Sequence, residues 1–326
     1  MQYILKKGDF NSFAKKVMSD FEFIAPTKGD ESKRVLKTQF SSIKNPKDIE
    51  LGVNTYFPAK YFFFDKKETL LNFKGNILKD VKIKVPQRVI FGLKKCDLNG
   101  IMHQDTVFLD ENVDPFYKKR RDATVLIGVH CKAGDEYCFC NSLELTDFHD
   151  LMFYEKEDVY AVETGSEKGE KFIKKFSSFF EEMDTITDDD RKTENTLSLH
   201  TTDIKDMYGN EGWKELADTC LSCGACNNLC PNCHCFTIQD EVEFDLKTGK
   251  RVRVPASCQL RSFTRVAGDH VFRDERTERY KHRIYHQIQY FKDRHDVVFC
   301  TGCGRCVRGC PAKIDWVAKI NEMKSS

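Results

Sequence analysis

Short apolar runs alternate with helical stripes along the first half of the chain. The runs are rich in β-branched or aromatic residues, as expected for strands of one sheet. They are Tyr61–Phe64, Arg88–Leu93, Thr124–Val129 and Leu151–Tyr154. A helical candidate such as Asn11–Phe21 precedes them. We therefore expect residues 1–185 to form an α/β domain.

The clearest helical stripe lies at Gly169–Met183. Its apolar residues recur at intervals of three and four, with lysines outside, which is typical of a helix that packs one face on a core. They are Phe172, Phe176, Phe179, Phe180 and Met183. We interpret this stripe as core packing and not as a cofactor site.

Apolar periodicity is lost after Asp184. The acidic and polar run from Asp188 to Asn195 predicts an exposed linker, which we place at residues 186–205. The remaining residues, 206–326, are expected to form a second domain.

Helical patterns and one hairpin dominate this second domain. Glu211–Thr219 predicts a short helix that places Trp213 inward, and Glu241–Val254 predicts a β-hairpin with a glycine turn. Two further helices are expected, at Cys258–Ala267 and in the segment that carries the stripe Tyr280, Ile284, Ile288 and Phe291. The basic residues near this stripe predict a solvated or subunit-docking surface. They are Arg273, Arg276, Arg279, Lys281 and Arg283.

Charge and cysteine usage restrict the functional class. The 52 lysines and arginines nearly cancel the 51 aspartates and glutamates, so nothing favours nucleic acid or an anionic membrane as partner. The first residues have no secretory signal pattern, so the 15 cysteines point to a reducing cytoplasm. Since no apolar stretch approaches the roughly 20 residues that span a bilayer, we expect no direct membrane contact.

Two copies of one cysteine pattern carry the strongest chemical signal. Each reads C-x2-C-x2-C-x3-C-P, the run that binds cubane iron–sulfur clusters in bacterial-type ferredoxins. The first ladder is Cys220, Cys223, Cys226 and Cys230, and the second ladder is Cys300, Cys303, Cys306 and Cys310. These runs predict two [4Fe–4S] clusters.

The last cysteine of each ladder is expected to bind the cluster of the other ladder, as in two-cluster ferredoxins. Cluster 1 would be held by Cys220, Cys223, Cys226 and Cys310. Cluster 2 would be held by Cys300, Cys303, Cys306 and Cys230. Zinc is the alternative, in which the chain is a zinc-stabilised interaction module without redox function.

Four cysteines of the first domain form a second candidate site. They follow predicted strands or lie in one tight loop: Cys96, Cys131, Cys138 and Cys140. Together they would suit a mononuclear iron or zinc ion. The alternatives are packing as free cysteines, or catalysis by Cys96, for which His103 and His130 are available but unplaced.

Three further cysteines follow the first ladder: Cys233, Cys235 and Cys258. They would either surround a cluster as neighbouring sulfurs or, with His234 or His270, form another mononuclear site.

The ladders and their surroundings resemble a known family. Cys220–Phe236, Ser257–Leu260, Val266–His270 and Tyr280–Tyr285 are similar to the β subunit of soluble hydrogenase/sulfur reductase (sulfhydrogenase) complexes and to the electron-transfer subunit of anaerobic sulfite reductase. Gly92–Ile101, Asp114–Tyr117 and Cys138–Cys140 continue the resemblance.

This resemblance implies an α-helical ferredoxin-type domain and an electron-transfer subunit of a cytoplasmic complex. One partner would be a flavin- and NAD(P)-binding reductase subunit, and the other a catalytic nickel–iron hydrogenase or sirohaem subunit. The chain has no G-x-G-x-x-G after a strand and no phosphate loop, so we expect no catalysis by this chain alone.

Overall fold

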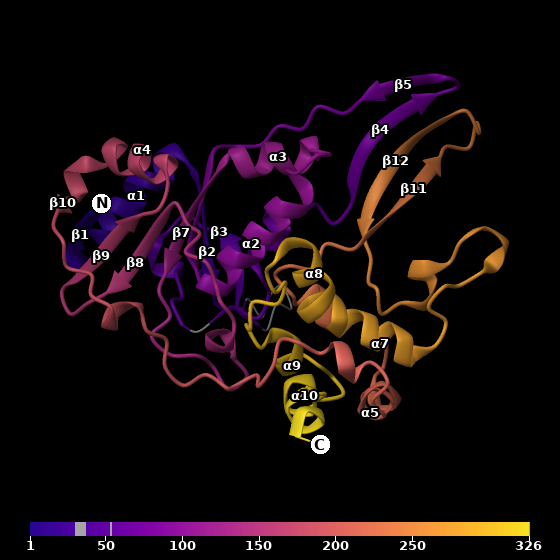
Figure 1. The fold of residues 1–326 in the computed structure, drawn as a ribbon. Helices are drawn as coiled ribbons and strands as arrows, with labels where there is room; N and C mark the ends of the chain where they lie inside the picture. Colours follow the sequence, from indigo (N-terminus) through magenta and orange to yellow (C-terminus); the bar gives the residue numbers. More distant parts are fainter. Residues whose placement is uncertain (30–36, 53, 326) are drawn as a thin grey trace. The chain divides into compact units, whose positions relative to one another are not determined.

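A computed structural model of the chain describes residues 1–29, 37–52 and 54–325 (Figure 1). Its contacts divide the chain into two compact units. Unit 1 comprises residues 1–59, 85–198 and 300–304, and unit 2 comprises residues 60–84, 199–299 and 305–326. The boundary after residue 198 falls inside the predicted linker, but both units are discontinuous in sequence, which the sequence did not predict.

Unit 1 is built on an eight-stranded sheet in the order β10-β1-β9-β8-β7-β6-β2-β3. Strands β2, β6, β7 and β8 are parallel, and antiparallel strands extend the sheet on both sides. The strands are β1 (Gln2–Lys6), β2 (Glu22–Thr27), β3 (Gln39–Ser42), β6 (Arg88–Leu93), β7 (Thr124–Val129), β8 (Leu151–Glu155), β9 (Val159–Thr164) and β10 (Glu181–Glu182). The α/β prediction for this part of the chain is therefore confirmed.

Helices cover this sheet. From α1 (Phe10–Asp20), Phe13 and Val17 join one buried cluster with Phe172 and Phe176 of the α4 region and with side chains of the central strands. Helix α2 (Lys95–Phe108) packs on β6 and β7. The ends of the buried parallel strands therefore deliver the chain into α2 and into the loop after β7.

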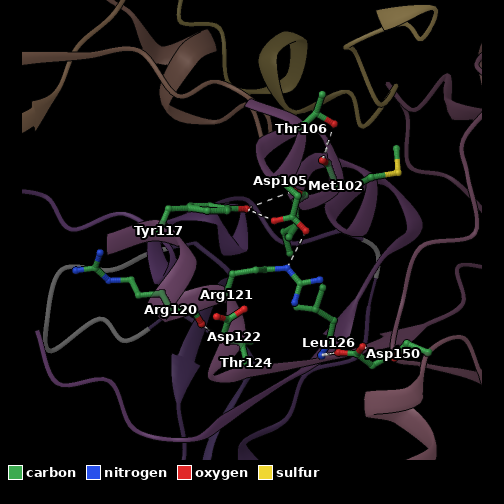
Figure 2. A network of polar contacts seen from close by, with 12 residues as sticks. Met102, Asp105, Thr106, Tyr117, Arg120, Arg121, Asp122, Thr124, Leu126 and Asp150 are labelled. Carbon is green, nitrogen blue, oxygen red and sulfur yellow. Dashed lines mark hydrogen bonds and ion pairs between the residues drawn. The ribbon is translucent and has the colours of Figure 1, made fainter. Parts of the chain in front are cut away.

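A polar network fixes α3 (Pro115–Asp122) to α2 (Figure 2). The Tyr117 hydroxyl donates to Asp105 Oδ1 at 2.6 Å, and Arg121 Nε donates to Asp105 Oδ2 at 2.9 Å. A second carboxylate, that of Asp150, accepts from the Leu126 amide of β7 at 2.8 Å. These contacts join α3 to α2 and the segment before β8 to β7.

Unit 2 contains a four-stranded antiparallel sheet in the order β11-β12-β4-β5. Its strands are β4 (Glu68–Lys74), β5 (Ile77–Asp80), β11 (Phe236–Val242) and β12 (Thr248–Pro255). The pair β11–β12 is the predicted hairpin, whereas β4 and β5 come from a distant part of the chain. A buried ion pair joins Glu68 of β4 to Arg253 of β12.

The helices of unit 2 surround the cysteine ladders in sequence. They are α5 (Gly212–Thr219), α6 (Ala225–Asn228), α7 (Arg276–Tyr285), a π-helical turn (His286–Tyr290), α8 (Lys292–His295), α9 (Arg305–Arg308) and α10 (Trp316–Ser325). The predicted apolar stripe of α7 and the segment after it is buried as expected. On α5, Trp213 is also buried and lies against Tyr285 of α7.

Three predicted elements differ from the structure. Tyr61–Phe64 is not a strand, because the chain forms a 3₁₀ turn at Ala59–Phe62. Cys258–Ala267 is not an α-helix: 3₁₀ turns form at Arg261–Thr264 and Ala267–Asp269, and Gly268 has a φ of 79° that a helix does not allow. The interval between the ladders therefore holds a hairpin and one interrupted helix, not two regular helices.

The stripe at Gly169–Met183 is helical only in part. Helix α4 spans Glu167–Lys175, and its start is fixed by Ser166 Oγ, which accepts from the Gly169 amide at 3.1 Å. Phe179 and Phe180 still pack on the core, but from a 3₁₀ turn and the residue after it, whereas Met183 is exposed.

The polar run after Asp184 is mostly exposed, as expected, but ion pairs hold it in place. Asp190 accepts from Lys156 at 2.8 Å, and Arg191 pairs with Glu163 at 2.7 Å. These contacts attach the run to unit 1.

Within the described ranges, no helix is long and apolar enough to cross a membrane.

Candidate iron–sulfur site

The first ladder begins where α5 ends. Ser222 and Gly224 both adopt left-handed backbone conformations, with φ values of 52° and 75°. This conformation turns the Ser222 amide toward Cys220 Sγ, to which it donates at 3.4 Å. The short helix α6 then carries Cys226.

The second ladder repeats this geometry. Gly302 and Gly304 occupy the equivalent positions and have φ values of 63° and 67°. The Gly302 amide donates to Cys300 Sγ at 3.4 Å, and the short helix α9 carries Cys306. Each ladder thus directs a backbone amide at a sulfur, the kind of contact that stabilises cluster-bound thiolates.

Within unit 2, Cys310 lies with the first ladder. Burial raises the pKa of the Cys220 thiol, and the charges of Cys310 and Cys223 raise it further. Burial raises the pKa of the Tyr280 phenol, and the negative charges of Cys226, Cys306, Cys220 and Cys310 raise it further, so thiols of both proposed clusters lie near this phenol. The effect of Cys310 on Cys220 fits the assignment of Cys310 to cluster 1.

Two buried cations lie among the thiols of unit 2. Burial would lower the pKa of the Arg283 guanidinium, but Cys233, Cys230 and Cys226 hold it high. Arg283 is only 5% exposed, and its Nε and Nη1 have no hydrogen-bond partner among the described residues. Lys60 is 6% exposed and donates to the carbonyl oxygens of Asn227 and Cys233 at 2.8 and 3.0 Å.

These cations test whether the residues fit an iron–sulfur cluster. A buried positive charge is costly unless a negative charge lies nearby. Neutral thiols do not provide it, whereas four thiolates bound to iron do. The N–H···S contacts and the two buried cations therefore both fit the cluster that the ladder spacing predicts.

Known proteins carry the same features. A family model described as a 4Fe-4S dicluster domain matches residues 219–314. Sulfhydrogenase 2 subunit beta of Pyrococcus furiosus is 32% identical to the chain over 307 residues, which cover 88% of this chain and 89% of that protein. The chain belongs to the sulfhydrogenase β-subunit family. No solved structure matches it.

This membership confirms the resemblance that the ladders indicated. The chain is thus an iron–sulfur protein of electron transport, with a 4Fe-4S dicluster domain at residues 219–314.

The sequence predicted that Arg283 lies on a solvated or docking face, and it did not identify Lys60 as a residue near the ladders. The basic face of α7 was predicted to be solvated or to dock a subunit, yet Arg279 and Arg283 are 7% and 5% exposed. Arg279 Nε donates to the Gln259 carbonyl at 3.0 Å, and Arg283 lies among the thiols. Only Arg276 at the start of the helix is exposed in the predicted way.

The three additional cysteines of unit 2 are gathered beside the first ladder. Cys258 shares a hydrogen bond with Cys235, which lowers the pKa of the Cys258 thiol to about 6. The side-chain amide of Asn227 donates to Cys258 Sγ at 3.3 Å and approaches Cys233 Sγ at 3.6 Å. His234 Nδ1 donates to the Asn232 carbonyl oxygen at 3.1 Å.

No group of three or more histidine, cysteine, aspartate or glutamate side chains in the described ranges is arranged to hold a metal ion. The mononuclear site at Cys233, Cys235 and Cys258 therefore stays a prediction. The observed contacts place these sulfurs near the cluster ligands, as the alternative interpretation expects.

The four cysteines of the first domain are brought together in unit 1. Cys96 lies in the first turn of α2, Cys131 follows β7, and Cys138 and Cys140 lie in the loop after it. All four line one cavity of about 310 Å³, together with Cys303 of the second ladder. The four residues thus share one cavity, and their binding of a metal stays a prediction.

The structure also places Asp97 and the two histidines. Helix α2 begins at Lys95, so Asp97 lies within its first turn. His130 lines the cavity and contacts the Lys192 carbonyl at 2.9 Å, whereas His103 is buried within α2.

Proposed function

We propose that this chain relays single electrons between two other subunits of a cytoplasmic oxidoreductase complex. The observation that carries the proposal is the repeated geometry of the ladders, in which equivalent left-handed residues direct an amide at the first sulfur of each run. A [4Fe–4S] cluster bound there would accept and release one electron at a time.

The proposed ligand sets are those expected from the sequence. Cys220, Cys223, Cys226 and Cys310 would hold cluster 1. Cys300, Cys303, Cys306 and Cys230 would hold cluster 2. The first set is supported by the closeness of Cys310 to Cys220.

The chain's own residues would set the environment of the bound iron. Backbone amides and the Trp316 indole, which donates to Cys306 Sγ at 3.3 Å, stabilise negative charge on sulfur. Arg283 and Lys60 balance that charge without exposure to water. Such contacts raise a cluster's reduction potential, because they favour the form with one more electron.

The partners follow from the family. The relative in Pyrococcus furiosus is named a β subunit of a sulfhydrogenase. We propose a flavin- and NAD(P)-binding reductase subunit on one side of this chain and a catalytic nickel–iron subunit on the other. A sirohaem partner, as in anaerobic sulfite reductase, is the alternative, but the identity to the sulfhydrogenase protein favours the nickel–iron partner.

Iron analysis of protein purified without oxygen tests this function. We expect about eight irons in the two ladder clusters and two interacting paramagnetic signals after reduction. Cys223→Ser should weaken one signal and Cys303→Ser the other. A colourless protein that contains zinc and no iron would instead support the zinc-stabilised module.

A further inference from the structure

The cavity of unit 1 is lined by more sulfur than packing requires. Cys96, Cys131, Cys138 and Cys140 reach it from the start of a helix, the end of a strand and one loop. Burial raises the pKa of the Cys140 thiol to about 11, and it raises that of Cys131 as well. Such thiols become thiolates when a metal displaces their protons.

The spacing of these sulfurs argues against one ion. Four thiolates around a single zinc or iron lie about 4 Å from one another, given bonds of about 2.3 Å. No three metal-binding side chains of the described ranges are grouped in that way. The thiols instead surround a cavity of about 310 Å³, several times the volume of a water molecule.

The same cavity contains a buried cation. Lys94 is 7% exposed, lines the cavity and lies near Cys131 and Cys96. The other two cations of the lining are paired with carboxylates, Lys95 with Asp147 at 2.7 Å and Arg191 with Glu163 at 2.7 Å. The described residues form no ion pair with Lys94, although the charges of Asp97 and Glu155 act on it from a greater distance. A negatively charged group in the cavity would stabilise it further.

The loop that carries Cys138 and Cys140 is fixed against the second ladder inside unit 1. The Phe139 amide donates to the Gly302 carbonyl at 2.9 Å, and Asn54 Nδ2 donates to the Cys303 carbonyl at 2.7 Å. Asn54 Nδ2 also approaches Cys138 Sγ at 3.7 Å. A side chain at Gly302 would come within 2.5 Å of the Cys140 backbone, so only glycine permits this packing.

From these observations we propose that unit 1 binds a third iron–sulfur cluster, held by Cys96, Cys131, Cys138 and Cys140. Four thiolate ligands suit a [2Fe–2S] or a [4Fe–4S] cluster alike. Each thiol loses its proton as it binds iron, and the cluster then changes by one electron at a time. Because Cys303 lines the same cavity, this cluster would exchange electrons with the second ladder. The inference extends the proposed relay into unit 1.

Iron content separates this proposal from the proposed function. The full chain, purified without oxygen, should hold more iron than two cubanes require, by about two atoms for [2Fe–2S] or about four for [4Fe–4S]. Cys96→Ser and Cys140→Ser should each return the content to about eight. Both variants should keep the paramagnetic signals of the ladder clusters, which shows that they fold.

Glu144→Gln is the matched control, because Glu144 lines the cavity and is exposed but offers no sulfur. It should keep all of the iron. A wild-type protein that holds only about eight irons would overturn the proposal. So would a Cys140→Ser variant in which a ladder signal changes but no additional cluster signal is lost. An extra metal that proves to be one zinc ion would overturn it as well. Cys223→Ser should weaken one ladder signal and keep the third signal, so this variant tests the proposed function separately from the third cluster.

Discussion

Arg283 is a buried side chain whose charge is expected to influence the reduction potential of clusters bound at the ladders. Its guanidinium lies among Cys233, Cys230 and Cys226, and part of it has no hydrogen-bond partner among the described residues. The contact that it does make, from Nη2 to the Cys226 carbonyl, measures 3.4 Å. Its effect on bound clusters is therefore expected to be mainly electrostatic.

Replacing this charge should make the clusters harder to reduce. At an effective dielectric constant of ~20, a charge roughly 8–16 Å away contributes ~1–2 kcal/mol, which is ~40–90 mV for a one-electron couple. We expect Arg283→Gln to lower the midpoint potential of at least one cluster by this amount in a redox titration followed by paramagnetic resonance.

Arg283→Lys keeps the charge and should shift the potential less. Arg276→Gln, on the exposed start of the same helix, is the control and should shift the potential less, because solvent screens the Arg276 charge where it acts on Cys220. Equal potentials in Arg283→Gln and Arg276→Gln would show that the buried guanidinium does not act on the clusters.

The sequence could predict the ladders but not the role of Arg283, for a physical reason. The ladder cysteines lie two or three residues apart, so their joint chemistry is a local property of the chain. The charged side of α7 has the spacing of a solvated helix face. Its burial depends on contacts with a cysteine segment that begins at Cys226, 57 positions earlier in the sequence. A contact at that distance leaves no periodic pattern in the sequence.

Among the elements, those with strong local patterns were predicted correctly. The apolar runs that form β6, β7 and β8 and the apolar stripe of α7 are each buried as a continuous set. Strands β4 and β5 were missed because β5 is exposed throughout and β4 is stabilised by a partner about 180 residues later in the chain. Sheet pairing at such distances leaves no short-range signal.

The ion pair between β4 and β12 should contribute strongly to that pairing. The side chains of Glu68 and Arg253 are 2% and 7% exposed. Glu68→Gln would leave the Arg253 charge buried without its counter-charge, which typically costs about 3–5 kcal/mol. We expect faster hydrogen–deuterium exchange in β4 and β12 and a lower midpoint of urea unfolding.

Lys67→Gln is the control variant, because Lys67 lies directly before the first residue of β4. The Lys67–Glu241 pair is largely exposed, with side chains 50% and 32% accessible, so its loss should change stability little. If Glu68→Gln were no more destabilising than Lys67→Gln, the buried pair would not stabilise the sheet.

At the scale of the whole molecule, unit 2 carries an exposed apolar surface at the end of its sheet. The turns after β4 and β11 are joined by a hydrogen bond from the Gly75 amide to the Lys247 carbonyl at 2.8 Å. Around them lie large apolar side chains that are at least half exposed. We call these residues the apolar tip: Ile77, Leu78, Val242, Phe244 and Leu246.

The apolar tip is expected to contact one of the proposed partner subunits. Burying a phenylalanine or leucine side chain contributes about 1.5–3 kcal/mol. The double variant Phe244→Ser, Leu246→Ser should therefore weaken binding between the subunits at least tenfold, or ~1.4 kcal/mol, when the complex is titrated by native mass spectrometry.

Phe272→Ser is the control, since Phe272 is also exposed, at 68%, but lies outside the apolar tip. It should associate normally. Unchanged association of the double variant would assign the subunit interface to another surface.

The participation of β4 and β5 in unit 2 limits how this protein can be dissected. A fragment that starts near residue 199 would contain both ladders but would leave the β12 backbone without its neighbouring strand. Such an unprotected edge invites intermolecular pairing and aggregation. A separately expressed electron carrier would therefore need residues 60–84 joined to it, for example through a designed connection.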